Sequence, residues 1–249
     1  MLRAYGDGNL FGEPYGEGPV RVLWLHGWQR RGQDFRAAAT ELAGDGVASV
    51  ALDLPGFGAS PPPLVAGGAR MYADLIAPAV AALADEPLVI VGHSLGGRVA
   101  TVLGAQYPEL VRALVLVAAP LVCMAEAKKA PWRYRLERFL GARGMVSPAR
   151  VDAARQRYGS ADYRNATGLI RDVLVAMVNE SYEDELARLV VPVSLLWGER
   201  DAEVPVAVAQ RALELIGSDH SLTVIAGIGH LVPLETPEEL RAAVRRALA

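Results

Sequence analysis

The segment Leu88–Gly97 constrains the fold more than any other part of the chain. It reads Leu-Val-Ile-Val-Gly-His-Ser-Leu-Gly-Gly, so an apolar run ends at a Gly-x-Ser-x-Gly pentapeptide, and a helix-compatible segment, Arg98–Tyr107, follows. A serine at such a strand-to-helix turn holds its hydroxyl out at the sheet edge, and Gly92 and Gly96 leave room for a strained turn. Amide groups at the start of the helix can face a developing oxyanion. The segment therefore predicts an α/β chain with Ser94 as a nucleophile.

Composition excludes several classes of protein. The 249 residues are 52% hydrophobic and 21% charged, which is typical of a globular chain with one large core. The net charge of −3 gives no basic surplus for nucleic acid. No apolar run approaches the roughly 18 residues of a membrane span, and the first residues lack a signal-peptide pattern. The single cysteine, Cys123, forms neither an internal disulfide nor a cysteine-based metal cluster. We expect a cytoplasmic protein with no nucleic-acid or membrane partner.

Short apolar runs alternate with helical patterns along most of the chain. The expected strands are Val20–Leu25, Ala48–Leu52, Leu88–Val91, Ala113–Val117, Val193–Trp197 and Ser221–Ile225. The expected helices are Gly32–Ala43, Ala69–Ala84, Leu95–Tyr107, Pro205–Ile216 and Pro237–Leu248, the last with Thr236 as its N-cap. This alternation predicts a mostly parallel, twisted sheet flanked by helices. The Gly-rich first twenty residues have room for one or two short antiparallel strands.

The strand rhythm stops between Leu121 and Leu189. Four helix-like stretches occupy this part: Ala125–Leu140, Pro148–Tyr158, Asn165–Asn179 and Tyr182–Leu189. An insertion this long is not expected to be a structureless loop. We interpret residues 121–189 as a helical cap over the sheet edge, with residues 1–120 and 190–249 as the core. The alternative is that these helices extend the main core.

Two further side chains are expected at the same sheet edge as Ser94. A serine needs a base to activate it, and the base needs an orienting carboxylate. His230 follows the last strand and a Gly-containing turn, and Asp201 follows the preceding strand. Glu199 and Glu203 compete with Asp201 because they lie in the same loop. The chain order Ser94, Asp201, His230 is that of the α/β-hydrolase triad.

The turn after the first long strand predicts an oxyanion site. Leu25-His26-Gly27-Trp28 can present the Trp28 amide, and the Leu95 amide is the second candidate donor. We expect the His26 side chain to brace this turn and Asp53 to have a structural role in the turn that follows it. The His93 side chain is expected to point away from the reaction.

The full set of motifs resembles the α/β-hydrolase superfamily over essentially the whole chain. The motifs are His26-Gly27, Asp53-Leu54-Pro55-Gly56-Phe57-Gly58-Ala59-Ser60, Gly92-His93-Ser94-Leu95-Gly96-Gly97, Gly198-Glu199-Arg200-Asp201 and Gly229-His230. The resemblance implies a serine nucleophile, an acyl-enzyme intermediate, and neither a metal nor another cofactor. Within the superfamily, the chain is similar to the pimeloyl-carrier-protein methyl esterases, which typically carry Trp in place of His93. Gly96-Gly97-Arg98 instead resembles menaquinone-pathway lyases, whose arginine at this place binds a substrate carboxylate.

Apolar residues near the expected mouth suggest an acyl or aryl pocket. The candidate substrate-binding residues are Trp28, Leu95, Arg98, Val122, Met124, Trp132, Val204 and Leu231. Residues 121–172 hold 11 Lys or Arg against five Asp or Glu, whereas the rest of the chain holds 14 against 23. Such a basic segment suits an acidic acyl carrier protein or an anionic acyl substrate, although a solvated surface without a partner gives the same pattern.

These observations favour a carboxylic ester hydrolase that acts on a small or carrier-linked ester. One alternative is a C–C bond hydrolase or a lyase that uses the same triad, with Arg98 holding a substrate carboxylate. Another is a non-enzymatic ligand receptor on the same scaffold.

Overall fold

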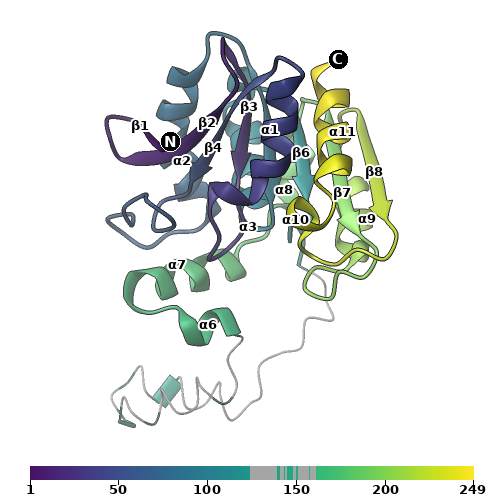
Figure 1. The fold of residues 1–249 in the computed structure, drawn as a ribbon. Helices are drawn as coiled ribbons and strands as arrows, with labels where there is room; N and C mark the ends of the chain where they lie inside the picture. The colour runs from purple at the N-terminus through teal and green to yellow at the C-terminus, as the bar shows by residue number, and fades with distance from the viewer. Residues whose placement is uncertain (124–138, 141–142, 144, 148–149, 151–156, 158–160) are drawn as a thin grey trace.

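The computed structural model describes residues 1–123, 139–140, 143, 145–147, 150, 157 and 161–249 (Figure 1). Eight strands form one sheet in the order β1-β2-β4-β3-β5-β6-β7-β8. They are β1 (Arg3–Tyr5), β2 (Leu10–Tyr15), β3 (Val20–Leu25), β4 (Ala48–Asp53), β5 (Leu88–His93), β6 (Val111–Val117), β7 (Val193–Gly198) and β8 (His220–Ile225). Strands β1 and β2 pair antiparallel, β2 pairs antiparallel with β4, and every other pairing is parallel. The mostly parallel sheet and the two antiparallel N-terminal strands are as predicted.

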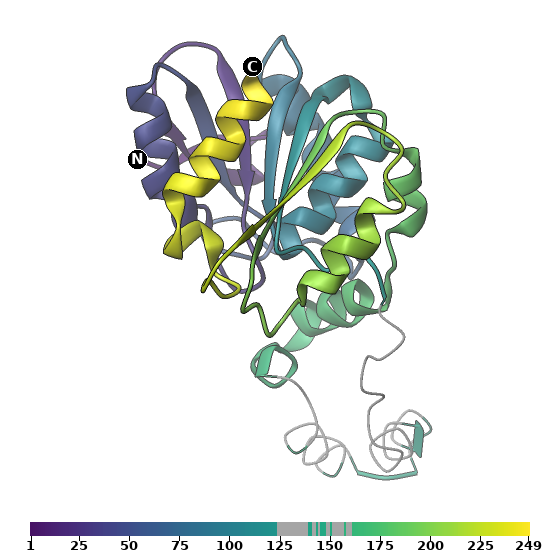
Figure 2. The same cartoon turned by 90° about the vertical axis from the view of Figure 1, so that its right-hand side faces the viewer.

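Helices cover both faces of the sheet. They are η1 (Gly32–Phe35), α1 (Arg36–Gly44), α2 (Ala69–Leu83), α3 (Leu95–Gln106), η2 (Pro108–Leu110), α6 (Ala161–Asn165), α7 (Gly168–Asn179), α8 (Glu183–Arg188), α9 (Val206–Leu213), α10 (Val232–Glu235) and α11 (Pro237–Leu248). Helices α1 and α11 pack together on one face, and α2, α3, α8 and α9 lie on the other (Figure 2). All six residues of β5 are buried, because helices shield this central strand from both sides.

The predicted helix Pro237–Leu248 is confirmed as α11, and Thr236 occupies its N-cap position. Thr236 does not cap α11 with its side chain; its hydroxyl donates a hydrogen bond to the carbonyl of Val232 at 3.3 Å. The short helix α10 runs almost directly into α11, so the Thr236 hydroxyl is used by the preceding turn.

The segment after β6 leaves the sheet and returns beside its starting point. Helix α7 lies across the carboxyl edge of the sheet, and α8 packs against α3 (Figure 1). Val173, Met177, Tyr182 and Leu186 join the same hydrophobic core as the sheet. The expected helices Ala125–Leu140 and Pro148–Tyr158 lie almost wholly outside the described residues, so the division into core and cap stays a prediction.

Among the described helices, none combines the length and the apolar composition that crossing a bilayer requires.

Candidate active site

Ser94 occupies a sharp turn between β5 and α3. Its backbone has φ 50° and ψ −108°, a left-handed conformation that costs a non-glycine residue about 1–3 kcal/mol. The two glycines beside it have no space for a side chain. A Cβ on Gly92 would overlap the backbone of Gly96, and a Cβ on Gly96 would overlap the carbonyl of Leu25. Close approach of three backbone segments therefore requires glycine on both sides of the serine.

His230 and Asp201 are hydrogen-bonded partners. Nδ1 of His230 donates to Oδ2 of Asp201 at 2.8 Å, and the Asp201 side chain is fully buried. The other oxygen of Asp201 accepts the amides of Glu203 and Val204 at 2.9 and 2.8 Å. The carboxylate is thus held by its own loop while it fixes the imidazole with Nε2 free to act on a reacting group.

The loops after β7 and β8 are joined by backbone contacts. The amide of Glu199 donates to Ile225 at 2.9 Å, and the amide of Arg200 donates to Ile228 at 2.8 Å. A Cβ on Gly198 would overlap the carbonyl of Gly229, so glycine is needed where the two loops touch. These contacts bring Asp201 and His230 together although 28 residues separate them in sequence.

Neither competing carboxylate bonds Nδ1 of His230 as Asp201 does. Glu199 accepts the amide of Gly227 at 2.9 Å on the protein surface. Glu203 is 69% exposed and lies 3.7 Å from Nε2 of His230, on the opposite side of the ring from Asp201. Asp201 is therefore the carboxylate that orients the imidazole, and Glu203 lies at the mouth of the site.

His93 supports the His230 loop from inside. Nε2 of His93 donates to the carbonyl of His230 at 2.9 Å, and the two rings lie 4.9 Å apart. Burial, together with the neighbouring His230, lowers the pKa of His93 to about 3, so this ring is neutral at physiological pH. Its Nδ1 is buried without a partner among the described atoms. Sequence reasoning missed this contact between the His93 side chain and the His230 backbone.

The turn after β3 has the expected braces. The amide of Leu54 donates to Nε2 of His26 at 2.9 Å, and Nδ1 of His26 donates to the carbonyl of Gly27 at 2.7 Å. Asp53 accepts the amides of Gly32 and Ala59, both at 2.8 Å, which confirms its structural role. These bonds fix the turn that carries the Trp28 amide.

A cavity of about 190 Å³ opens at this edge of the sheet. Its lining residues are Trp28, Ser94, Leu95, Arg98, Pro120, Asp162, Leu174, Met177, Val178, Glu203, Val204 and His230. Ser94, His230 and both predicted oxyanion residues therefore border one space. Of the other predicted substrate-binding residues, Arg98 and Val204 line it. Val122 is buried and Leu231 half-buried, outside this lining. Met124 and Trp132 lie outside the described residues.

Sequence reasoning missed the wall that α7 contributes. Leu174, Met177 and Val178 line the cavity, and their spacing of three and four residues places them on one face of the helix. That spacing was visible in the sequence, but it did not reveal which way the face points.

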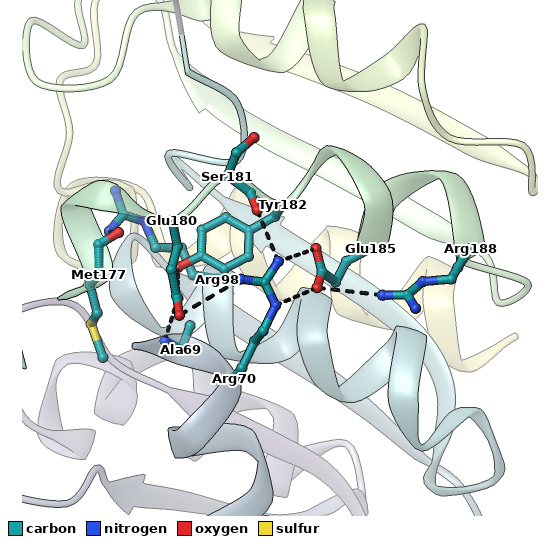
Figure 3. Close-up of polar contacts among 9 residues, drawn as sticks. All are labelled: Ala69, Arg70, Arg98, Met177, Glu180, Ser181, Tyr182, Glu185 and Arg188. Carbon is teal, nitrogen blue, oxygen red and sulfur yellow. Dashed lines mark hydrogen bonds and ion pairs between the residues drawn. The ribbon is translucent and has the colours of Figure 1, made fainter. Parts of the chain in front are cut away.

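Arg98 borders the cavity but two of its donors point into the protein. Nε donates to the carbonyl of Pro120 at 3.1 Å. Nη1 donates to the carbonyl of Met177 at 2.9 Å; both of these residues are drawn in Figure 3. Burial lowers the pKa of its guanidinium. The expected contact with a substrate carboxylate must compete with these bonds.

Within the described part of the chain, no three His, Cys, Asp or Glu side chains gather in a way that holds a metal ion.

Comparison with known proteins gives the family. A family model described as serine aminopeptidase, S33, matches residues 19–237. A pimeloyl-(acyl-carrier protein) methyl ester esterase of Chromobacterium violaceum is 31% identical over 215 residues, which cover 80% of this chain and 82% of that protein. Lipase LipV of Mycobacterium tuberculosis is 34% identical over 269 aligned positions, covering 96% of this chain and 98% of its own.

Solved structures agree on the fold. An esterase from Thermogutta terrifontis superimposes with a TM-score of 0.70 at 24% identity, covering 100% of this chain and 98% of that one. A hydrolase from Pseudomonas aeruginosa PA01 gives a TM-score of 0.74 at 19% identity, with the same coverage. The chain therefore belongs to the α/β-hydrolase superfamily, within the family of serine hydrolases and esterases whose model spans residues 19–237.

Proposed function

We propose that the protein hydrolyses carboxylic esters through an acyl-enzyme intermediate. Ser94 attacks the ester carbonyl while Nε2 of His230 takes the hydroxyl proton. His230 then returns that proton to the leaving alcohol. A water molecule, activated by the same imidazole, releases the carboxylic acid and regenerates Ser94. Asp201 keeps the imidazole in the tautomer that accepts at Nε2 and stabilises the cation that forms.

Two amides are proposed to stabilise the tetrahedral oxyanion. Leu95 is the first residue of α3, where amides lack a partner within the helix, and Trp28 lies in the braced turn after β3. Both residues line the cavity together with Ser94. Losing one such donor typically lowers turnover by about 100- to 1000-fold.

The Asp201–His230 hydrogen bond of 2.8 Å, at a cavity that also holds the strained Ser94, carries this proposal. The strained backbone of Ser94 and the buried carboxylate of Asp201 both cost free energy of folding. Their meeting at one cavity is what acyl transfer requires.

Labelling with a fluorophosphonate and hydrolysis of p-nitrophenyl esters test the proposal together. We expect stoichiometric labelling of Ser94 in the wild type. Ser94→Ala should abolish labelling and lower kcat by at least about 10⁴-fold. Ser60→Ala is the matched control, because this buried hydroxyl donates to the carbonyl of Asp53 away from the cavity. Labelling at another serine, or turnover that survives Ser94→Ala, would reject the mechanism.

We propose carrier-linked acyl esters as a substrate class to be tested. The support is the similarity to the pimeloyl-(acyl-carrier protein) methyl ester esterase of Chromobacterium violaceum and the excess of six positive charges over residues 121–172. Reversing the charge of Arg133, Arg135 and Arg138, which lie outside the described residues, should weaken turnover of carrier-bound esters but not of small esters. Reversing the exposed Arg21 and Arg246 is the control. Equal effects of the cap reversals on both substrates would reject carrier binding.

A further inference from the structure

A cluster of charged and aromatic side chains lies at the base of the cap, beside the cavity but outside the proposed chemistry (Figure 3). Arg98 enters it from α3, Arg70 from α2 and Glu185 from α8. Glu180 and Tyr182 come from the connection between α7 and α8. Three separate parts of the chain therefore meet here.

Arg98 joins the segment through which the chain leaves β6, residues 118–121, to the segment through which it returns to α8, residues 177–182. We call these two segments the legs of the cap. Pro120 belongs to the segment that leaves β6, and Met177 lies in the last turn of α7 on the way back. The guanidinium donates to the carbonyls of both residues, at 3.1 and 2.9 Å. Next to this bridge, the amide of Tyr182 donates to the carbonyl of Leu121 at 3.2 Å. The outgoing and returning segments are thus joined twice, once by the Arg98 side chain and once by a backbone hydrogen bond.

The returning segment is also tied to the core. The Tyr182 hydroxyl donates to Glu180 at 2.8 Å, and the same carboxylate oxygen accepts the first amide of α2, from Ala69, at 2.8 Å. Arg70 donates to both oxygens of Glu185 at 2.7 and 2.9 Å. The Tyr182 ring lies between the two guanidinium groups, 5.6 Å from that of Arg70 and 5.8 Å from that of Arg98.

The chemistry of arginine fits this bridging position. Burying a cation costs free energy, so an apolar residue at position 98 would stabilise the fold more if packing were its only role. A lysine ammonium lacks the rigid fork that donates in two fixed directions at once. Because Arg98 follows Ser94 by four residues, about one helical turn, whatever it holds is kept at a fixed place relative to the nucleophile.

We propose that Arg98 is a specificity-determining residue. It clamps both legs of the cap and so fixes one wall of the acyl pocket, which is formed by Pro120, by Met177 and by the residues next to Met177 on α7. The inference rests on the proposed ester hydrolysis, since it assigns the acyl group to this wall. Under it, Arg98 acts through the backbone carbonyls that it holds and not by binding a substrate carboxylate.

The main test measures kcat and KM for p-nitrophenyl esters from acetate to decanoate in Arg98→Met and Arg98→Lys. We expect the spread of kcat/KM across the series to shrink by at least about fivefold in both variants, with KM changing more than kcat, because a loosened wall discriminates less between chains. Arg112→Gln is the matched control, since Arg112 is exposed and donates to the carbonyl of Leu248 at 3.1 Å, outside this cluster. A wild-type chain-length profile in both Arg98 variants would overturn the clamp.

A second variant covers the case in which Arg98→Met does not fold. Glu180→Gln weakens the bonds to Tyr182 and Ala69 without emptying the guanidinium site, and it should narrow the chain-length profile in the same direction by a smaller factor. An unchanged profile in Glu180→Gln, with Arg98→Lys also like wild type, would count against the clamp.

Limited proteolysis separates this inference from the proposed function. Trypsin has 11 Lys or Arg sites in residues 121–172. Under native conditions we expect Arg98→Lys to be cut there at least about fivefold faster than the wild type, since local opening exposes cleavage sites. Equal cleavage rates would overturn the clamp. If the wild type neither hydrolyses esters nor reacts with the fluorophosphonate, the proposed function fails while the cleavage comparison still decides whether Arg98 holds the cap.

Discussion

The Ser94 turn and the base of the cap are held by different kinds of contact. Around Ser94, the chain is fixed by glycines whose missing side chains let backbones touch, and the strand that leads to it, β5, is wholly buried. At the cap base, charged side chains from α2, α3 and α8 do the holding. The backbone contacts at the glycines contain no ionisable group, whereas contacts of the second kind can be altered one hydrogen bond at a time. The comparison suggests that the reacting groups are rigidly placed and the pocket wall is adjustable.

Asp201→Asn should have the largest effect and should distinguish the reacting groups from the pocket wall most clearly. We expect kcat to fall by about 10³- to 10⁴-fold for every ester. The asparagine amide favours the tautomer of His230 that carries its proton on Nε2, and it does not stabilise the imidazolium that forms during the reaction. The ratio between long and short acyl chains should stay as in the wild type. Steady-state kinetics on the ester series checks both points. Glu199→Gln, in the same loop, should change kcat little, and a large effect there would undermine the assignment of Asp201.

Gly96→Ala tests whether backbone contact alone positions the turn. Its Cβ would overlap the carbonyl of Leu25, which cannot move aside as a flexible side chain can. We expect a loss of about 3 kcal/mol in the free energy of unfolding. Turnover should also drop by at least about 100-fold, because the adjacent Leu95 amide is displaced. Urea unfolding and kinetics measure the two effects.

Gly44→Ala is the control for that experiment. Gly44 ends α1 with open space where a Cβ would be, so the substitution should leave activity unchanged and stability equal or slightly higher. If Gly96→Ala behaved like Gly44→Ala, the rigid-turn half of the comparison would be wrong.

Glu185→Gln tests the charged region. Glu185 is 1% exposed and makes a two-oxygen ion pair with Arg70, whose side chain is 39% exposed. We expect a loss of about 2 kcal/mol, less than for a fully buried pair, because solvent screens the arginine. The ratio of kcat/KM between long and short acyl chains should change by a larger factor than kcat for p-nitrophenyl acetate. Glu214→Gln, in the exposed pair with Arg211, should change neither quantity.

His93→Gln changes only the pH dependence of stability, with little effect expected at neutral pH, and it refers to the rigid side. The folded pKa of His93, about 3, lies below the ordinary value near 6.5, so the unfolded chain binds a proton there that the folded chain excludes. The stability contribution is complete above pH 6.5 and is lost as pH falls towards 3, by about 1.4 kcal/mol per pH unit. The Gln variant cannot titrate, so its unfolding free energy should fall less steeply between pH 6.5 and 4.

The control for the pH experiment is His220→Gln, because that ring is exposed. Burial also lowers the pKa of His26, so the His93 variant retains one buried histidine and a residual slope. An unchanged slope in His93→Gln would mean that His93 is not the neutral, buried ring described here.

The sequence allowed the sheet and the three triad candidates to be predicted because those features have local signals. A parallel strand reads as a mostly apolar run. Ser94 follows such a run directly, whereas Asp201 and His230 each follow one after a short turn. The cluster at the cap base has no such signal. Glu185 stands in a charged helix that resembles a solvated surface, and its burial depends on Arg70, 115 residues earlier. Arg98 gave the opposite difficulty, since its sequence neighbours suggested a ligand while its partners are carbonyls from distant segments.

The backbone conformation of Ser94 carries an evolutionary consequence. With φ at 50°, glycine is the residue that this position favours on conformational grounds, so Ser94→Gly should make the protein more stable while removing its nucleophile. Selection for thermal tolerance alone would drive the chain towards an inert variant at this codon.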